Sequence, residues 1–366
     1  MTADQALPQV QRNDSSDADV VVIGGGQAGL AVAWHLQQQG LRPLVLEAGD
    51  QVGHTWRSRR NSLTLFTPAE YDGLPGRPFP APAGSYPGKD VVADYLSDYA
   101  RAAGLRVETN SRVTRLRQHP LGFEVHTSDR VVLVPQVVVA TGPFQVPVVP
   151  SFAHDLDPSV HQVHSAEYRD PASLPDGSVL VVGGGNSGFQ IAEELAASRQ
   201  VDLAIGTEYP VLPQRVLGRD LFWWYTRTRL IRVPATSRLG RRVQARGEFV
   251  IGSDRRRLQA AGVRFRPRAL GASGRTVRFA DGSTANVDVV VWATGYRSDH
   301  SWIDVPGVLA DGRVVHRRGV TNVPGLSFVG LPWQHTRGSA LLGFVGGDAA
   351  HVADVARRHA ETAAVT

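Results

Sequence analysis

Short, continuous apolar runs alternate with amphipathic segments along most of this chain. A run at residues 19–23 is followed by an apolar periodicity typical of a helix and by a second run at residues 43–46. The same order returns at residues 179–182 and 201–205, again with a helical pattern between them. Continuous apolar strands separated by helices are typical of a parallel sheet covered on both faces. The pattern therefore predicts an α/β fold with two doubly wound, Rossmann-like domains.

A glycine-rich turn joins strand to helix in each half. VVIGGGQAGLA at residues 21–31 has GxGxxG spacing, and VVGGGNSG at residues 181–188 repeats it. In such a turn the first glycine permits the tight bend, the second lets a pyrophosphate approach the backbone, and the third lets the helix pack on the strand. The N-terminus of the helix then offers free N–H groups to the phosphates. Two such turns predict two bound dinucleotides. The residues expected to contact them are Gly24, Gly26, Gln27, Ala28, Gly29, Gly183, Gly185, Asn186, Ser187 and Gly188.

The residue that ends the second strand differs between the halves. Glu47 stands where a carboxylate can accept hydrogen bonds from ribose hydroxyls. The equivalent position in the second half is Gly206, which has no carboxylate to repel a 2′-phosphate. This favours NADPH, leaves NADH open, and makes Arg215 or Arg199 the candidate partner of the phosphate. FAD at the first turn and a visiting NAD(P)H at the second is the usual pair in such enzymes.

Composition narrows the class of oxidoreductase. The 366-residue chain contains no cysteine, which excludes the redox pair of disulfide reductases as well as thiolate metal sites. The histidines lack the spacing of a standard zinc site, so no metal is predicted. The formal charge is +5, and every basic residue except Lys89 is an arginine. The excess is interpreted as spread along the chain, and its densest runs are not interleaved with stacking aromatics, so no nucleic-acid partner is predicted.

The N-terminus and the length of the apolar runs bear on where the protein acts. Residues 1–17 are polar and acidic, so they are expected to be disordered and do not resemble a secretory signal. No apolar run approaches the ~18 residues that a membrane-spanning helix needs. The sequence therefore predicts a cytoplasmic protein without a membrane partner.

Five stretches outside the turns carry further information: AGDQVGHTWR at 48–57, LTLFTPAEYDGLPGRPFP at 63–80, YPGKDVVADYL at 86–96, ATGPFQVPVVP at 140–150 and WATGYRSD at 292–299. They resemble the corresponding stretches of class B flavin-containing monooxygenases, especially the short bacterial members and the plant enzymes that oxidise indole pyruvate. The family fingerprint is half present in PSVHQVHSAEY at 158–168: His164, Ser165 and Tyr168 match, whereas Pro158 and Val160 depart from it. The resemblance covers about residues 18 to 355.

The resemblance implies an FAD domain formed by residues 18–150 and 290–366, with an NAD(P)H domain inserted at residues 151–289. It implies hydride transfer from NADPH to FAD, then O2 addition at the flavin C4a position, and a peroxide that oxygenates a small-molecule nitrogen, sulfur or keto-acid substrate. His335 and Arg337 are the candidate catalytic residues, with the role of orienting substrate or flavin oxygen. Further cofactor contacts are expected at Ala48, Gly53, Trp56, Arg57, Thr141, Gly142, Thr294, Gly295, Gly346 and Asp348.

Three points stay open at this level. Classical members carry an Asn that steadies the oxygenated flavin; here the region reads LFTPAE, so Phe66, Thr67 or Pro68 takes its place. The aromatic residues 222–225 are the core of an inserted helix, a substrate wall or a homodimer contact, and residues 217–250 are expected to carry specificity. The alternatives to a monooxygenase are a flavin oxidase or NAD(P)H reductase that releases hydrogen peroxide, and a non-catalytic nucleotide- or redox-sensing module.

Overall fold

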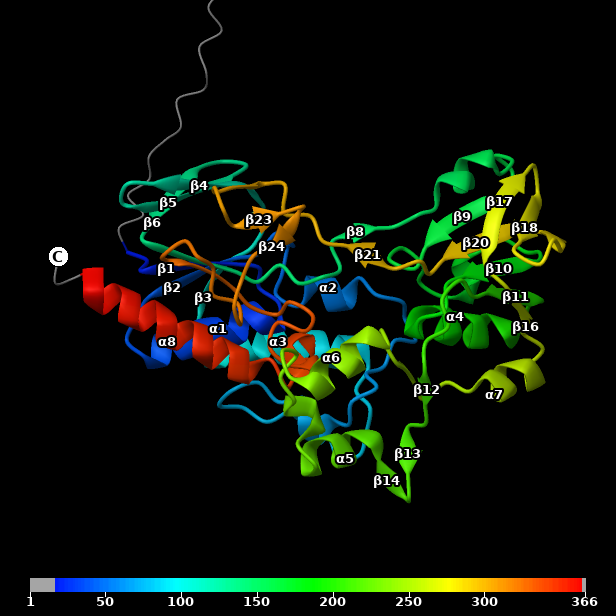
Figure 1. Ribbon diagram of the computed structural model, residues 1–366, viewed down its shortest axis with the longest axis horizontal. Helices are drawn as coiled ribbons and strands as arrows, with labels where there is room; N and C mark the ends of the chain where they lie inside the picture. Colours follow the sequence, from blue (N-terminus) through cyan, green and yellow to red (C-terminus); the bar gives the residue numbers. More distant parts are fainter. Residues whose placement is uncertain (1–16, 364–366) are drawn as a thin grey trace, which may run out of the picture.

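Two parallel five-stranded sheets form the centres of two lobes in the computed structural model, which describes residues 17–363 (Figure 1). In the first lobe, β1 (Val20–Ile23) is central, with β2 (Pro43–Leu46) and β3 (Arg106–Glu108) on one side and β7 (Gln136–Val139) and β25 (Leu326–Phe328) on the other. In the second, β10 (Val179–Val182) is central, flanked by β11 (Val201–Ala204) and β16 (Arg264–Arg266), and by β20 (Val289–Trp292) and β9 (His161–His164). Four strands of each sheet correspond in order, and the fifth, β25 or β9, comes from the opposite end of its lobe's sequence. This arrangement confirms the predicted α/β class with two Rossmann-like sheets.

Each face of the first sheet is covered by a different layer (Figure 1). Val20 and Val22 face the helices α1 (Gln27–Gln38), α3 (Lys89–Ala102) and α8 (Gly346–Ala363). Val21 and Ile23 face a sheet of the antiparallel strands β4 (Val113–His119), β5 (Gly122–Thr127) and β6 (Val131–Val134). The short strand β22 (Ile303–Asp304) extends this sheet by pairing with β4. Successive strand residues point to opposite faces, so a strand buried on both sides must be apolar at every position.

The second lobe repeats this plan. Val179 and Val181 lie in the core under α4 (Asn186–Ala196) and α7 (Arg255–Ala260). Leu180 and Val182 face the small sheet of β17 (Ala269–Ser273), β18 (Thr276–Phe279) and β19 (Thr284–Asn286). The chain passes between the lobes at β8 (Val146–Pro147) and β21 (Tyr296–Arg297), which pair antiparallel.

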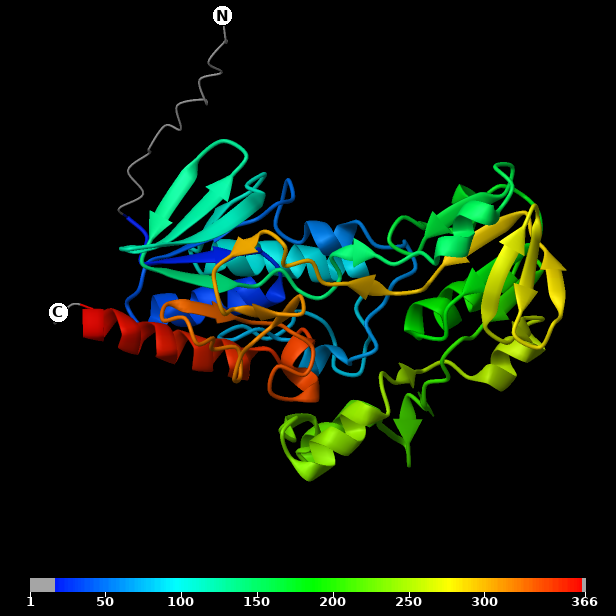
Figure 2. The ribbon, with the colours of Figure 1, turned by 45° about the horizontal axis from the view of Figure 1, so that its top comes forward.

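A segment of the second lobe reaches across to the first. We call residues 213–249 the insert; its stalk is the parallel pair β12 (Val211–Leu212) and β15 (Val250–Ile251). It contains the hairpin of β13 (Arg215–Val216) and β14 (Arg219–Asp220), then α5 (Leu221–Arg227) and α6 (Arg238–Ala245). Figure 2 shows it in yellow-green at the lower edge of the molecule. The helix expected at residues 222–225 is thus confirmed as α5.

The insert is held on the first lobe by polar and aromatic contacts. Gln214 Nε2 donates to Phe66 O at 3.0 Å, and the Ala235 N–H donates to His335 O at 2.7 Å. The Phe222 ring stacks on Phe66 with centroids 5.9 Å apart. Phe222 therefore packs between the insert and the first lobe, whereas Trp223 and Trp224 contact each other within the insert.

Two further sequence predictions concern the chain ends and membranes. The disorder expected for residues 1–17 lies outside the described residues except at Asp17. No described helix combines the length and the apolar character needed to cross a bilayer.

Candidate functional site

The first glycine turn requires glycine at two positions and leaves open space at a third. Gly24 has φ +109°, and a Cβ there would lie 2.7 Å from Ala140 O. A Cβ at Gly29 would lie 1.9 Å from Gly24 O. Gly26, which precedes α1, has an ordinary φ of −79°, and a Cβ there would meet no atom within 4 Å. The turn therefore keeps the space before the helix N-terminus clear, as a bound pyrophosphate requires.

Glu47 closes this turn from the end of β2. Its Oε2 accepts the Gly25 N–H at 2.7 Å, and its Oε1 accepts the Gly49 N–H at 2.8 Å. A carboxylate has about four lone-pair positions, so each oxygen retains one for a ribose hydroxyl. Ala48 is exposed beside it. The position fits the sequence prediction for the FAD ribose.

The segment after Glu47 folds back onto α1. Gly53 has φ +81° and precedes the short helix α2 (His54–Arg57). Trp56 Nε1 donates to Gln27 Oε1 at 3.3 Å, which ties this helix to the first residue of α1. Arg57 pairs with Asp94 at 2.5 Å, while its buried Nε has no partner among the described residues. Trp56 and Arg57 thus lie on a short helix that packs beside the start of α1.

The second turn has the same geometry. Gly183 has φ +141°, and a Cβ there would lie 2.1 Å from Ala293 O. A Cβ at Gly188 would lie 2.0 Å from Gly183 O. Gly185, which precedes α4, has φ −88° and nothing within 4 Å of its Cβ position. Both lobes thus present an unobstructed helix N-terminus.

Asn186 connects the second turn to the stalk of the insert. Its Nδ2 donates to Phe249 O at 2.8 Å, and its Oδ1 accepts the Ile251 N–H at 2.9 Å. Ser187 is half-buried beside it. Both ends of the Asn186 side chain are therefore engaged by the protein, and its role in this structure is to anchor β15.

An arginine that the sequence analysis missed lies at the end of β11. Arg268 Nη2 donates to Gly206 O at 2.9 Å, and a Cβ at Gly206 would lie 3.3 Å from the guanidinium. Arg199 instead donates to carbonyls of segment 171–175, and Arg215 lies in the β13–β14 hairpin of the insert. The guanidinium that lies against Gly206 is therefore that of Arg268, 62 residues further along the chain, and the roles expected of Arg215 and Arg199 stay predictions.

The residues Thr141, Gly142, Thr294 and Gly295, predicted as cofactor contacts, lie where the chain crosses between the lobes. Gln145 Nε2 donates to Thr141 Oγ1 and to Gly142 O, both at 2.8 Å. The Val148 N–H donates to Gly295 O at 3.0 Å. The Gln145 bonds brace the first crossing segment, and the Val148–Gly295 bond joins it to the second.

The fingerprint segment lies at the same junction. His164 Nε2 hydrogen-bonds to Gly295 O at 3.1 Å, and burial lowers the pKa of His164. Arg60, only 7% exposed, donates to Gln190 Oε1 of α4 at 2.6 Å. Burial lowers the pKa of Arg60, and the nearby Glu194 carboxylate opposes that shift. A buried guanidinium thus bridges the first lobe to the helix of the second turn.

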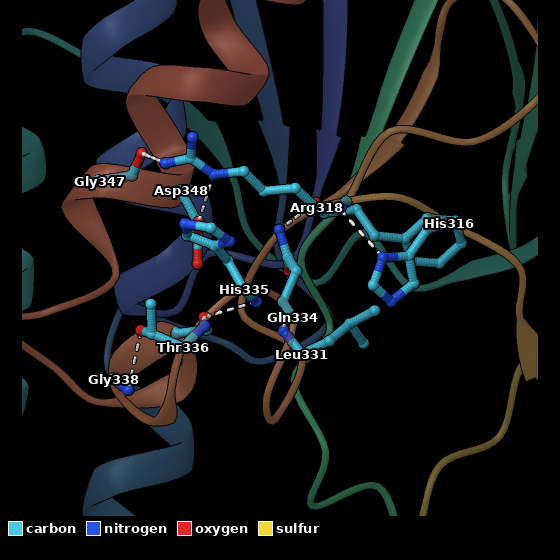
Figure 3. A network of polar contacts seen from close by, with 12 residues as sticks. His316, Arg318, Leu331, Gln334, His335, Thr336, Gly338, Gly347 and Asp348 are labelled. Atoms are coloured by element: carbon cyan, nitrogen blue, oxygen red, sulfur yellow. Dashed lines mark hydrogen bonds and ion pairs between the residues drawn. The ribbon is translucent and has the colours of Figure 1, made fainter. Parts of the chain in front are cut away.

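A polar network surrounds the first turn of α8 (Figure 3). Arg318 Nε donates to the buried Asp348 Oδ1, and its Nη2 to Gly347 O, both at 3.1 Å. The His335 N–H donates to Ser339 Oγ at 3.1 Å. Burial and the Arg318 charge lower the pKa of His335, so its imidazole is neutral at neutral pH. The expected start of the last helix at Gly346 is confirmed, and His335 lies beside it.

Arg337, the second candidate catalytic residue, is bound to the insert. Its Nη2 pairs with Glu248 Oε2 at 2.7 Å, and its side chain is 19% exposed. We expect Arg337→Gln and Glu248→Gln each to accelerate tryptic cleavage within the insert by roughly two- to fivefold, because a partly exposed pair contributes up to about 1 kcal/mol. The double variant should be cleaved no faster than either single variant, because the pair is already broken in each of them. Loss of NADPH turnover in Arg337→Gln alone would instead assign this arginine to the reaction.

The segment that replaces the missing Asn contains a buried hydroxyl–carboxyl pair. Thr67 Oγ1 donates to Asp72 Oδ1 at 2.5 Å, and both side chains are buried. Asp72 Oδ2 has no partner among the described residues. Burial raises the pKa of Asp72 to about 7, against the opposing effect of the Thr67 bond. The carboxyl therefore holds a proton over part of the physiological range.

Asp72 should make stability fall as pH rises. Its folded pKa exceeds the unfolded value of about 4, so its contribution is complete below about pH 4 and is lost as pH rises through about 7. Between about pH 5.5 and pH 8 we expect wild-type stability to fall by about 2 kcal/mol more than that of Asp72→Asn. Denaturant titrations at both pH values measure this. Asp176→Asn removes an exposed carboxylate and is the control, so its stability should change with pH as that of the wild type does. If Asp72→Asn and the wild type lose the same stability between the two pH values, the assignment is contradicted.

A cavity of about 440 Å³ lies between the first lobe and the insert. Thr226 and Arg232 line it from the insert, and Tyr71, Arg77 and Phe344 from the first lobe. Glu70 lines it as well. The cavity thus offers aromatic surface, two guanidinium groups and one carboxylate to a small ligand.

Two open glycine turns on two Rossmann-like sheets define an oxidoreductase that uses two dinucleotides. The sequence profile described as pyridine nucleotide-disulphide oxidoreductase matches residues 21–210. The chain belongs to this family, and within it is of the class B flavin-containing monooxygenase type.

Individual relatives agree with this assignment. An uncharacterized oxidoreductase, CzcO-like, of Geobacillus kaustophilus is 43% identical over 91% of this chain and 97% of its own. The rice indole-3-pyruvate monooxygenase YUCCA1 is 29% identical over 87% of this chain and 85% of its own. The structure of a flavin-containing monooxygenase from Stenotrophomonas maltophilia is similar with a TM-score of 0.78, 29% identity, and coverage of 94% and 99%. The predicted class is confirmed.

Proposed function

We propose that this protein is an FAD- and NADPH-dependent monooxygenase acting on a small molecule. The observation that carries the proposal is the matched pair of open helix N-termini at Gly26 and Gly185, one in each lobe. The absence of cysteine from the chain supports oxygen chemistry over disulfide chemistry within its family. The domains proposed are 18–150 with 290–366 for FAD, and 151–289 for NADPH.

The first lobe would hold FAD through its own residues. The N–H groups at the start of α1 would bind the pyrophosphate, and Glu47 the ribose. The N-terminus of α8 would face the flavin ring with its partial positive charge, and Arg318 fixes Asp348 in this first turn. Trp56 and Arg57 would complete the cradle beside Gln27.

The second lobe would hold the nicotinamide nucleotide. The start of α4 would bind its pyrophosphate. The Arg268 guanidinium at Gly206 would donate hydrogen bonds to a 2′-phosphate. This arginine, together with the lack of an acid at Gly206, supports NADPH over NADH. Arg60 would keep α4 oriented toward the first lobe through Gln190.

Bound FAD supplies hydride acceptance and reaction with O2, which delivers one oxygen atom to a nitrogen, sulfur or keto-acid substrate and the other to water. The residues of the chain position the reactants and exclude water. Phe66 and Phe222 stack between the insert and the first lobe. The Thr67–Asp72 pair could hold a proton in the segment where other members carry Asn. The cavity, lined by Arg77, Arg232 and Glu70, would suit a small polar substrate with an aromatic or anionic group.

The product balance tests this proposal. Purified protein should be yellow, and NADPH should bleach its flavin under anaerobic conditions. On exposure to O2 with candidate amines, thioethers and keto acids, a monooxygenase should convert NADPH to oxygenated product in nearly equal amounts. Full conversion of NADPH to hydrogen peroxide with every substrate would support a flavin oxidase instead. Bound FAD that NADPH never reduces would support a sensing module. The possible homodimer of this protein stays a prediction from its sequence.

A further inference from the structure

The positive charge of this protein is concentrated in the insert. Nine of the 39 basic residues of the chain and two of its 34 acidic residues lie in the insert, residues 213–249. The insert therefore has a net charge of +7, and the rest of the chain has −2. The interpretation of the arginines as spread along the chain was wrong, because it considered short runs and not the balance of charge by segment.

These arginines are exposed, and few acidic residues accompany them: Asp220 lies opposite Arg215 in the β13–β14 hairpin, and Glu248 pairs with Arg337. All nine are exposed, and none forms a salt bridge within residues 17–363. The arginine run of α7 differs, because Arg255 pairs with Glu208 at 3.2 Å and Arg257 with Glu193 at 2.6 Å. Uncompensated charge on one projecting segment creates a strong local positive potential.

Apolar side chains are exposed on the same segment. Leu217, at the tip of the β13–β14 hairpin, is 85% exposed, and Leu230 and Leu239 are 45% and 47% exposed. In α6, Arg238, Arg241 and Arg242 share one side of the helix, since residues three and four apart are neighbours. Exposed leucines among arginines are typical of a surface that lies in the headgroup region of a bilayer.

We infer that the insert binds the surface of a membrane rich in anionic phospholipid, with its arginines on headgroup phosphates and Leu217 in the interface. A nucleic acid would explain the arginines and leave the leucines exposed. A second copy of the chain would bring the same positive surface against itself. The cavity described above is lined by Arg232 of the insert, so this binding places the cavity at the lipid interface. The inference does not depend on the proposed reaction, and it replaces the expectation of no membrane partner.

Vesicle sedimentation tests the inference with the full-length, FAD-loaded protein. Vesicles of equal parts phosphatidylcholine and phosphatidylglycerol should bind it, and vesicles of phosphatidylcholine alone should not. Binding should weaken sharply between about 0.1 M and about 0.5 M salt, because exposed charges are screened. The combined variant Arg238→Gln, Arg241→Gln, Arg242→Gln should bind about 100-fold more weakly, at about fivefold per arginine. Leu217→Ser should weaken binding about tenfold.

The matched control removes three arginines elsewhere. The combined variant Arg255→Gln, Arg256→Gln, Arg257→Gln makes the same change in net charge on α7, and it should keep vesicle binding within about threefold. Circular dichroism and flavin absorbance verify that every variant is folded. Equal losses in the two triple variants, or no binding by the wild type to either vesicle, would overturn the inference. Tight binding to duplex DNA without vesicle binding would assign the surface to nucleic acid.

Discussion

Gly26→Val should yield a folded protein that no longer retains FAD. In the protein alone a Cβ at Gly26 meets no atom within 4 Å, and its φ of −79° suits any residue. The valine would therefore occupy only the space that a pyrophosphate needs at the start of α1. We expect FAD affinity to fall by roughly 100-fold or more, which is about 3 kcal/mol. Flavin absorbance after purification and titration of the apoprotein with FAD measure this loss.

Gly185→Val is the matched control in the second lobe, where the same space is open. This variant should purify with FAD and be reduced by dithionite, but NADPH should no longer reduce it at a measurable rate. The two outcomes separate cofactor loss from general damage, because each variant should lose one nucleotide only. If Gly26→Val keeps its flavin, or if Gly185→Val is reduced by NADPH at the wild-type rate, the assignment of that turn is wrong.

Arg268→Gln should change the choice between NADPH and NADH. The Arg268 guanidinium lies against Gly206, where a charge-assisted contact to a 2′-phosphate would be lost. We expect the KM for NADPH to rise roughly 10- to 100-fold, corresponding to about 1.5–3 kcal/mol for a hydrogen bond to a charged group. The KM for NADH, which lacks this phosphate, should change less than about threefold. Steady-state flavin reduction with each nucleotide gives both values.

Arg215→Gln is the control for this experiment. Arg215 was the sequence-based candidate, but it lies in the hairpin of the insert, so its loss should leave both KM values within about threefold. An equal rise of both KM values in Arg268→Gln would mean that this arginine merely supports the backbone at Gly206. A larger effect in Arg215→Gln would restore the original prediction.

The central strands could be predicted almost to the residue. Pro43–Leu46 and Val179–Val182 have the predicted bounds because each is an apolar run buried on both faces. Predicted runs at residues 19–23 and 201–205 were each one residue too long, since a strand end is set by pairing with its neighbours. The glycine turns were equally predictable, because GxGxxG spacing after an apolar run is a local pattern, although the atoms that exclude a side chain at Gly24 and Gly183 belong to the distant Ala140 and Ala293.

The side chains that complete the site could not be predicted in the same way. Arg268, Arg318 and Asp72 have no local motif, and each owes its position to a partner elsewhere in the fold or to burial. Arg337 was predicted as catalytic from its loop, and the structure pairs it with Glu248 of the insert. Pairwise contacts across long separations depend on how the two lobes and the insert pack, which periodicity does not encode.

The insert also limits how the lobes can move. Two paired strands, β8 and β21, would by themselves act as a hinge about a single axis. The insert adds a brace away from that axis, fixed to α4 through Asn186 and to the first lobe through Gln214. Any swing that widens the gap for an incoming nucleotide must bend the stalk or break these bonds. Mechanical stiffness of the two-lobed body thus depends on a segment that belongs to neither sheet.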